Sequence, residues 1–367
     1  MTDTARPAHD ANQAFMRRAL ELAREGWGQT APNPMVGAVV VRDGRIVSEG
    51  FHARFGADHA EAVALRRAGE AARGATLYVT LEPCRHYGKV PPCTDVILES
   101  GVARVVYAAP DPTGVAGGGS AILKASLLEV ESGVLEREAR ELNAPFYHAA
   151  VSELPWTTLK LAVSADMAIA TEQGSTTWLT GEPSRAEVHR MRANSDAVAV
   201  GVGTILADDP RLTVREAPKP RKPPARVVFD RSLRTPLQAK VVLTARETPT
   251  IVIANAAADP AKADVLREAG VHVLNATDLH DAFRRLRSAG VQSLLVEGGA
   301  TIASEVVKEG LVHRLALFQA PITLGPSALR AFGSSTAGFV ERMDLMRVVE
   351  RREIGPDVLT VYALVES

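Results

Sequence analysis

Three side chains in the first quarter of the chain have the residue types and spacing of a zinc site. They are His59, Cys84 and Cys93, one imidazole and two thiols, with eight residues between the two cysteines. Three protein ligands leave the fourth tetrahedral position of zinc open, which is typical of catalytic rather than structural sites. Zinc would acidify a bound water toward neutral pH and so make hydroxide available as a nucleophile. Glu61, two residues after His59, is placed to carry a proton from this water to a leaving amine.

The pairing of His-x-Glu with a later Pro-Cys is the signature of zinc-dependent deaminases, although the second cysteine follows at a wider spacing in this chain. Two other interpretations are open: an exposed histidine beside two core thiols, or a structural zinc whose fourth ligand is His86. The catalytic interpretation is favoured because Cys84 and Cys93 are the only cysteines of the chain and both fall within the motif.

The composition of the 367 residues is that of a globular protein of about two domains. Hydrophobic residues make up 46% and charged residues 23%, so cores of normal size can form. The formal net charge of -1 removes the simplest signature of a nucleic-acid or membrane-surface binder. Apolar runs such as 36–41 are far below the roughly 18 residues that span a bilayer. Residues 1–10 lack the apolar core of a signal peptide, so we expect a cytoplasmic protein.

Helix-like and strand-like segments alternate along the first half, which predicts an α/β domain with helices on both faces of a sheet. Strands are predicted over 37–41, 45–50, 76–81 and 104–108, and helices over 15–25, 60–73 and 94–100. Asp43-Gly44 predicts a hairpin between the first two strands. His59 and Glu61 therefore lie at the start of a helix, and Cys84 follows a buried strand.

A domain boundary is predicted near 143–155, where Pro145 and Pro155 bracket a stretch of weak periodicity. The alternation of strands and helices then restarts. Strands are predicted over 156–164, 196–200, 226–229, 250–254 and 293–296, and helices over 185–193, 261–269, 279–289 and 301–309. Residues 217–224 predict a surface connection rich in proline and lysine.

Segments of the first half resemble a known family. They are Asn33-Pro34-Met35-Val36-Gly37, the stretch from Gly50-Phe51-His52 to His59-Ala60-Glu61, and the stretch from Leu81-Glu82-Pro83-Cys84 to Cys93. This half is similar to the deaminase half of the bifunctional riboflavin biosynthesis deaminase–reductases. The resemblance implies hydrolytic loss of the ring 2-amino group of a pyrimidinone ribosylamino 5′-phosphate. It implies substrate contacts at Asn33, His52, His86 and Lys89.

Two of these contacts also make chemical sense from the residue types. Lys89 can pair with a phosphate, and Asn33 can offer a donor and an acceptor to the edge of a heterocycle. Each has a simpler interpretation as well, because Asn33 before Pro34 fits a turn residue and Lys89 fits a solvated loop charge.

The resemblance continues through nearly all of the second half, which looks like the reductase half of the same family. It rests on residues that include Lys160, Ser164, Asp166, Thr180-Gly181, Arg192, Gly203-Thr204 and Glu297-Gly298-Gly299. The resemblance implies a dihydrofolate-reductase-like fold that uses NADPH. The implied cofactor-binding residues are Ala162, Trp178, Thr204, Asp208, Arg231, Gly299, Ala300 and Thr301. The implied substrate-binding residues are Lys160, Thr176, Arg192, Leu212, Arg215 and Glu297.

Local chemistry in the second half agrees in part. The predicted strand 293–296 leads into Gly298-Gly299 and a helix, and such a turn lets a phosphate approach the helix N-terminus. A Gly-x-Gly-x-x-Gly fingerprint is absent, so a Rossmann domain is not supported. Arg192 and Arg215 are candidate clamps for the substrate phosphate. The simpler interpretations are exposed surface arginines, a core tryptophan at Trp178, and a capping or surface role for Glu297.

Two positions depart from the family pattern. Met167 stands where the family commonly has glycine, and methionine is unfavourable if this position needs a positive φ. Arg231 replaces a small polar residue and could instead contact a cofactor phosphate.

We therefore expect an α/β chain with a cytidine-deaminase-like α/β/α domain over 1–149 and a dihydrofolate-reductase-like domain over 150–367. The first would deaminate 2,5-diamino-6-ribosylamino-4(3H)-pyrimidinone 5′-phosphate with zinc-activated hydroxide. The second would reduce the ribosyl chain with NADPH to give 5-amino-6-ribitylaminouracil 5′-phosphate. We expect a homo-oligomer formed through the reductase domain and no nucleic-acid or membrane partner. The alternative is a zinc-dependent nucleoside or nucleic-acid deaminase whose second domain is non-catalytic or differs in specificity.

Overall fold

The computed structural model describes residues 5–171, 179–331 and 345–364, with side chains from residue 10 onward. The chain divides into two compact units, Met1–Val151 and Ser152–Ser367, and each has a central sheet of its own. No helix within the described ranges is long and apolar enough to cross a membrane.

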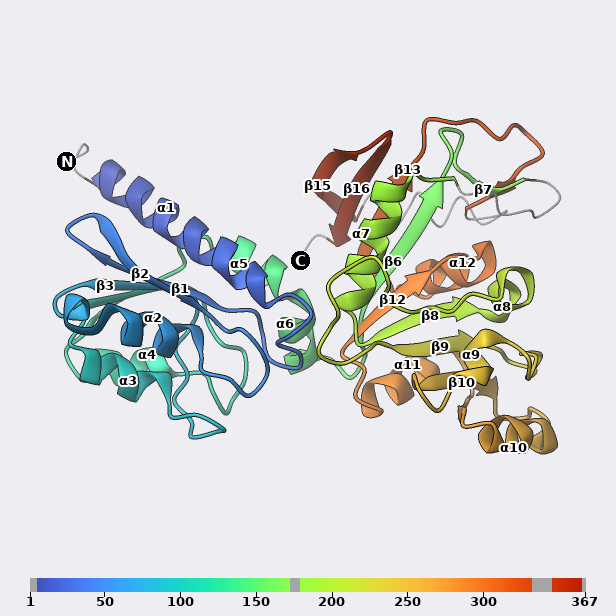
Figure 1. Ribbon diagram of the computed structural model, residues 1–367, viewed down its shortest axis with the longest axis horizontal. Coiled ribbons are helices and arrows are strands. Elements are labelled where there is room, and N and C mark those ends of the chain that lie inside the picture. Colours follow the sequence, from blue (N-terminus) through green and yellow to red (C-terminus); the bar gives the residue numbers. More distant parts are fainter. Residues whose placement is uncertain (1–4, 172–178, 332–344, 365–367) are drawn as a thin grey trace. The chain divides into compact units, whose positions relative to one another are not determined.

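The first unit is built on a five-stranded sheet with the strand order β2-β1-β3-β4-β5 (Figure 1). Its strands are β1 Gly37–Arg42, β2 Arg45–Phe51, β3 Thr76–Leu81, β4 Arg104–Ala109 and β5 Glu129–Ser132. β1 runs antiparallel to β2 and β3, whereas β3, β4 and β5 are parallel. Asp43 and Gly44 have φ values of 51° and 73° between β1 and β2, which confirms the predicted hairpin.

Helices cover both faces of this sheet, as expected for strands that are buried on both sides. They are α1 Ala5–Ala23, α2 Ala60–Ala68, α3 Cys93–Ser100, α4 Gly119–Ala125, α5 Glu136–Leu142 and α6 Ala144–Val151, with short 3-10 turns at Arg24–Gly26 and Gly69–Ala72. α1 covers one face, where Met16 and Leu20 pack with Val39. α2 and α3 cover the other face, where Leu65 and Ile97 belong to a second core.

The second unit is built on a nine-stranded sheet with the order β11-β10-β9-β8-β12-β6-β13-β16-β15. The strands from β11 to β13 in this order are parallel, and β16 and β15 continue the sheet antiparallel. Their bounds are β6 Trp156–Val163, β8 Ala197–Gly201, β9 Ala225–Phe229, β10 Thr250–Asn255, β11 His272–Ala276, β12 Ser293–Glu297, β13 Arg314–Gln319, β15 Met346–Ile354 and β16 Asp357–Leu364. The short strands β7 Ala168–Ala170 and β14 Leu329–Arg330 pair separately.

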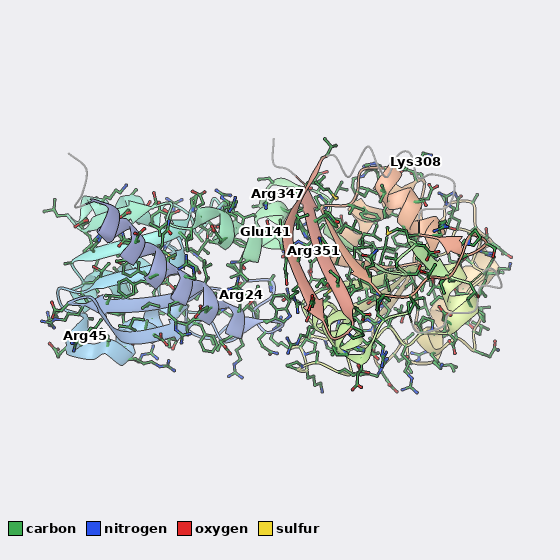
Figure 2. All side chains as sticks on the ribbon, turned by 90° about the horizontal axis from the view of Figure 1, so that it is seen from above. Arg24, Arg45, Glu141, Lys308, Arg347 and Arg351 are labelled. Carbon is green, nitrogen blue, oxygen red and sulfur yellow. The ribbon has the colours of Figure 1, made fainter. Side chains whose placement is uncertain are left out.

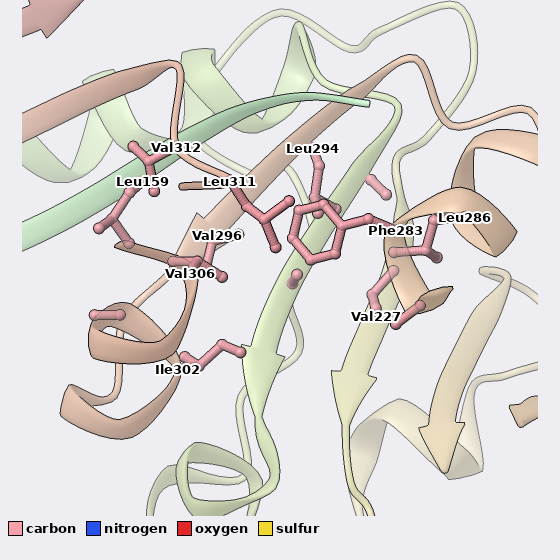
Figure 3. Packing of buried hydrophobic residues seen from close by; sticks show 14 of the residues in the cluster. Leu159, Val227, Phe283, Leu286, Leu294, Val296, Ile302, Val306, Leu311 and Val312 are labelled. Atoms are coloured by element: carbon pink, nitrogen blue, oxygen red, sulfur yellow. The ribbon is translucent and has the colours of Figure 1, made fainter. Parts of the chain in front are cut away.

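Helices again lie on both faces of the larger sheet. Their bounds are α7 Glu182–Ala193, α8 Val202–Asp208, α9 Lys240–Leu243, α10 Pro260–Glu268, α11 Leu279–Ser288 and α12 Ala300–Lys308. Phe283 and Leu286 of α11 pack in one core with Ile302 and Val306 of α12 (Figure 3). The edge strand β15 carries charged side chains, including Arg347 and Arg351 (Figure 2), and charge on an edge strand opposes pairing with other chains.

The predicted helices and strands are confirmed in position, and most ends differ by a few residues, but α1 begins at Ala5, ten residues before its predicted start. The predicted boundary stretch near 143–155 contains the division between the two units, after Val151, and α6 occupies most of the stretch. Proline is tolerated there, because Pro145 is near the first turn of α6, where its missing N–H has no intrahelical role. Met167 has a φ of 64°, so this position does need the left-handed conformation that favours glycine.

Candidate active sites

The three predicted metal ligands lie together at one end of the first unit's sheet. His59 is the residue before α2, Cys84 follows β3, and Cys93 begins α3. The His59 Nδ1 atom lies 3.2 Å from Cys93 Sγ and 3.5 Å from Cys84 Sγ. With zinc bonds of about 2.1 Å to nitrogen and 2.3 Å to sulfur, tetrahedral N and S ligands lie about 3.5 Å apart. The donor set therefore fits a zinc ion.

The electrostatics of this cluster favour an ionised sulfur. Hydrogen bonds from Cys93 and His59 lower the pKa of Cys84 to about 4, and the Cys93 backbone N–H donates to Cys84 Sγ at 3.4 Å. Glu61 lies in the first turn of α2 with its side chain buried, and this burial raises the pKa of its carboxyl group. Burial therefore favours the protonated form of this carboxyl group.

Asn33 and His52 form a hydrogen-bonded chain that ends beside the metal ligands. Asn33 Nδ2 lies 3.3 Å from His52 Nε2, and His52 Nδ1 lies 3.0 Å from the carbonyl oxygen of Asp58. A carbonyl oxygen can only accept, so His52 Nδ1 carries the proton and Nε2 accepts from Asn33. The Oδ1 atom of Asn33 is available to accept a hydrogen bond from a ligand. Both ring nitrogens of His52 are engaged in hydrogen bonds within the chain, so direct substrate contact by His52 stays a prediction.

The loop between the two cysteines carries the other two predicted substrate residues. Lys89 Nζ lies 4.1 Å from the ring centre of Phe55, and the lysine side chain is exposed. His86 is not part of the His59, Cys84 and Cys93 cluster among the described residues, which disfavours a closed structural zinc site. The buried Nδ1 atom of His86 has no hydrogen-bond partner in the described part of the chain.

Glu82 is a site residue that the sequence analysis missed. Its buried carboxylate accepts hydrogen bonds from the backbone N–H of Ser120 at 3.0 Å and of Asp111 at 3.3 Å. Glu82 thus ties the glycine-rich loop before α4 to the turn that carries Cys84. In the sequence, the signal for this role of Glu82 was the position of an acidic residue directly after a predicted buried strand.

A cleft of about 1490 Å³ lies in the second unit. It brings together all the described residues that were predicted to bind cofactor or substrate in the reductase half. They are Lys160, Ala162, Arg192, Thr204, Asp208, Leu212, Arg215, Arg231, Glu297, Gly299, Ala300 and Thr301. Thr176 and Trp178 lie outside the described residues.

An ion pair between Arg192 and Glu297 lines this cleft. Two nitrogens of the guanidinium donate to the two carboxylate oxygens at 2.5 and 2.7 Å, and a third donates to the Thr213 carbonyl oxygen. The two side chains are 12% and 9% exposed, so the surface interpretations of both residues were wrong. Burial alone would raise the pKa of Glu297, but Arg192 and Lys160 outweigh it and hold the pKa below its ordinary value.

The pairing reduces the number of hydrogen-bond donors that Arg192 can offer to a phosphate, because three of them are already engaged within the chain. Arg215 is exposed beside the same cleft, where its guanidinium donates to Thr213 Oγ1 at 3.2 Å and its backbone N–H donates to His189 Nδ1 at 3.3 Å. Leu212 has a buried side chain and a φ of 52°, so only its backbone is available to a ligand.

The opposite part of the cleft is formed by turns at the carboxyl ends of parallel strands, the usual ligand edge of such sheets. Gly298 and Gly299 follow β12 with φ values of 66° and 85°, and α12 begins directly after them. A Cβ atom on Gly299 would lie 3.1 Å from Thr204 Oγ1 of α8, so glycine lets the two turns come close. Arg231 follows β9 at the same edge.

Comparisons with known proteins cover both units. Residues 9–109 match the model of the cytidine and deoxycytidylate deaminase zinc-binding region, and residues 155–360 match that of the RibD C-terminal domain. The riboflavin biosynthesis protein RibD of Aquifex aeolicus is 45% identical over 96% of this chain and 98% of that protein. RibD of Escherichia coli is 37% identical over 95% of this chain and 98% of that protein.

Solved structures agree with these sequence matches. Acinetobacter baumannii RibD superposes with a TM-score of 0.85 at 37% identity, over 98% of this chain and 100% of that chain. A Thermotoga maritima diaminohydroxyphosphoribosylaminopyrimidine deaminase/5-amino-6-(5-phosphoribosylamino)uracil reductase has a TM-score of 0.82 at 36% identity, with the same coverage. The matches extend over both halves, which disfavours a nucleoside or nucleic-acid deaminase with an unrelated second domain.

The two domain types also define the cofactors, zinc in the deaminase domain and NADPH in the reductase domain. The chain therefore belongs to the RibD family, the bifunctional deaminase–reductases of riboflavin biosynthesis.

Proposed function

We propose that residues 1–149 form the deaminase domain, in which His59, Cys84 and Cys93 hold the zinc ion. The observation that carries this proposal is the approach of one imidazole nitrogen to two sulfurs at separations that suit tetrahedral zinc. When bound, zinc supplies a Lewis acid that lets water act as a nucleophile near neutral pH.

Glu61 is the proton carrier of the deamination. Its buried carboxylate takes a proton from the attacking water and gives it to the ring amino group, which leaves as ammonia while the water oxygen stays on the ring carbon. Burial raises the pKa of Glu61, and this favours a group that can both accept and release a proton.

Substrate contacts follow from the hydrogen bonds already in place. Asn33 presents Oδ1 to an N–H group of the heterocycle, while one of its two amide hydrogens is donated to His52. Lys89 and His86, on the loop between the cysteines, face the 5′-phosphate. His52 holds Asn33 in its orientation.

Residues 150–367 form the reductase domain, and its cleft binds NADPH and the deaminated product side by side. Gly299, Ala300 and Thr301 at the start of α12 bind the cofactor's diphosphate, with Ala162, Trp178, Thr204, Asp208 and Arg231 as further cofactor contacts. Lys160, Thr176, Arg192, Leu212, Arg215 and Glu297 contact the substrate. When bound, NADPH would supply the hydride that reduces the ribosyl chain.

Lys160 supplies the proton that the ribosyl oxygen takes up when its ring opens. Burial lowers the pKa of the Lys160 ammonium, which makes it a better acid, and the negative Glu297 nearby keeps it charged. Arg192 completes this charged group by fixing Glu297.

We further propose that the protein acts in the cytoplasm on small molecules, without nucleic-acid or membrane partners, and assembles as a homo-oligomer through the reductase domain. The near-neutral charge and the family's small-molecule chemistry support the first part. The oligomer rests on the family resemblance, and sedimentation of the purified chain tests it.

A paired assay tests the proposed roles. Purified protein should carry about one zinc ion per chain, the number that one three-ligand site holds. Glu61→Gln should lower the deamination rate by about 10²–10⁴-fold, the usual contribution of a general acid–base group. The same variant should reduce a pre-deaminated substrate with NADPH at the wild-type rate.

The controls separate the two sites. Glu305→Gln changes a carboxylate of the second unit's cleft, far in sequence from the deaminase motif, and should leave deamination unchanged. Protein without zinc after growth in zinc-supplemented medium would contradict the metal site. Loss of both activities in folded Glu61→Gln would contradict independent sites.

A further inference from the structure

Asn143 makes an unusual pair of hydrogen bonds across the first unit. Its side chain is 4% exposed and lies at the end of α5, just before α6. The Met35 N–H donates to Asn143 Oδ1 at 2.8 Å, and Asn143 Nδ2 donates to the Met35 carbonyl oxygen at 2.8 Å. One amide side chain therefore pairs with both polar groups of a single residue, as a neighbouring strand would.

The hydrogen bonds from Asn143 add to the burial of Met35 and Val36 in holding the segment before β1. The segment contains Pro34, which has no N–H to donate. Its other backbone bonds run from Asn33 N to the Thr30 carbonyl oxygen and from His52 N to the Val36 carbonyl oxygen. The two bonds from Asn143 thus fix the middle of the segment against the body of the unit.

This segment carries Asn33, whose side-chain amide is linked through His52 to the residue before the proposed zinc ligand His59. Asn33 Nδ2 lies 3.3 Å from His52, and His52 lies 3.0 Å from the carbonyl oxygen of Asp58, the residue before His59. A shift of the Met35 peptide would therefore move the Asn33 amide relative to the zinc ligands, although Asn143 itself belongs to a distant part of the sequence.

We propose that Asn143 is a positioning residue for deamination, which sets the Asn33 amide for the heterocycle by holding the Met35 peptide. The inference rests on the proposed role of Asn33. It assigns to the stretch just before the unit boundary a part in the specificity of the first active site.

Steady-state deamination by the full chain tests this inference with Asn143→Ala, Asn143→Asp and Asn33→Ala. Asn143→Ala should raise KM and lower kcat/KM by about tenfold or more, since misplacements of about 1 Å can cost up to about 10²-fold. Asn143→Asp keeps an acceptor for the Met35 N–H but sets a second oxygen against the Met35 carbonyl oxygen, so it should also raise KM. Zinc content and the NADPH-dependent reduction of pre-deaminated substrate should stay at wild-type values.

Asn12→Ala is the matched control. Asn12 is a buried asparagine of the same unit, 7% exposed, but its partners are Tyr78 and Glu131, away from the substrate segment. It should lower the unfolding temperature without changing KM. A KM change in Asn12→Ala equal to that in Asn143→Ala would show that loss of stability alone explains both.

A double variant decides whether Asn143 acts through Asn33. If it does, Asn33→Ala/Asn143→Ala should be no worse than Asn33→Ala, because coupled residues are not additive. Wild-type KM in folded Asn143→Ala, or fully additive losses in the double variant, would overturn the inference. A wild-type chain that does not deaminate would instead overturn the proposed function.

Discussion

Arg192 and Glu297 show how much a single pair of side chains can determine in the reductase cleft. Two short hydrogen bonds join them, and both side chains are nearly buried. Removing one partner of such a pair leaves a buried charge without compensation, which costs about 3–5 kcal/mol in typical proteins. The pair therefore stabilises the second unit, at a place where we propose that the substrate binds.

Glu297→Gln should lower the free energy of unfolding of the second unit by about 3 kcal/mol at pH 7. The pKa of Glu297 in the folded chain lies below its ordinary value of 4.5. The ionised Glu297 carboxylate therefore contributes fully to the free energy of unfolding above about pH 4.5. This contribution is lost as the pH falls through the lowered pKa of the folded chain. The difference between wild type and variant should shrink in denaturant unfolding series as the pH falls from 5 toward 3.

Glu350→Gln serves as the surface control, because its side chain is 48% exposed where it pairs with Arg352. Exposed pairs contribute about 0–1 kcal/mol, so this variant should stay close to wild type at every pH. A Glu297→Gln deficit that stays constant down to pH 3 would argue that the carboxylate's charge is not what stabilises the fold.

Residue type decided which site residues the sequence could predict. His59, Cys84 and Cys93 stand out because thiols are rare in this chain and their spacing suits a metal. Glu82 and Asn143 do not stand out, since their roles come from backbone groups that only the folded chain brings near them. Arg192 was predicted as a site residue but not as half of a buried pair.

At the scale of elements, the packing of α2 on β2 places His59 and Glu61, the proposed metal ligand and proton carrier. Gly50 of β2 faces this helix so closely that a Cβ atom would lie 2.6 Å from the Ala60 carbonyl oxygen and 2.6 Å from the Ala64 nitrogen. Ala60 stands between His59 and Glu61. The absence of a side chain at Gly50 is therefore what lets the helix start where the site needs it.

Gly50→Ala should push the start of α2 outward and weaken zinc binding by about tenfold or more, as changes that reorient metal ligands usually do. Zinc retained against chelators of graded strength measures this effect. Gly114→Ala is the control, because a Cβ atom there would meet nothing within 4 Å. Equal zinc retention by the two variants would show that the helix tolerates the shift.

The elements themselves were largely predictable, and the exceptions have physical causes. Strands such as Thr76–Leu81 are short runs of β-branched, aromatic and aliphatic residues bounded by turn residues, a pattern that predicts a strand. α6, Ala144–Val151, contains a proline and has no clear polar face, so its periodicity is weak. The left-handed φ of Met167 was suspected only because the family has glycine there, since methionine itself gives no such signal.

At the scale of the whole molecule, two compact units with two cofactors should respond to ligands separately. Multidomain chains commonly unfold in more than one transition. Ligand at about 100 times its Kd stabilises the unit that binds it by about 2.7 kcal/mol. For a unit of this size that corresponds to about 5–10 °C.

Calorimetry should therefore show that chelation of zinc lowers the transition of the first unit alone, and that NADPH raises that of the second alone. Two single variants identify the transitions. Cys93→Ser should abolish the response to zinc chelation and spare the response to NADPH, and Gly299→Val should do the reverse. One cooperative transition that moves with either ligand would contradict independent units.

The strand order of the larger sheet also affects how the protein can be synthesised. β6 is the first strand of its unit to leave the ribosome, but its neighbours β12 and β13 come from the last quarter of the chain. The smaller sheet, by contrast, is complete once β5 has emerged. We expect the deaminase half to fold during translation, whereas the reductase half can complete its sheet only after the final hairpin of β15 and β16 has been synthesised. A premature stop codon before β16 would then release a chain with one finished enzyme and one open, aggregation-prone sheet edge.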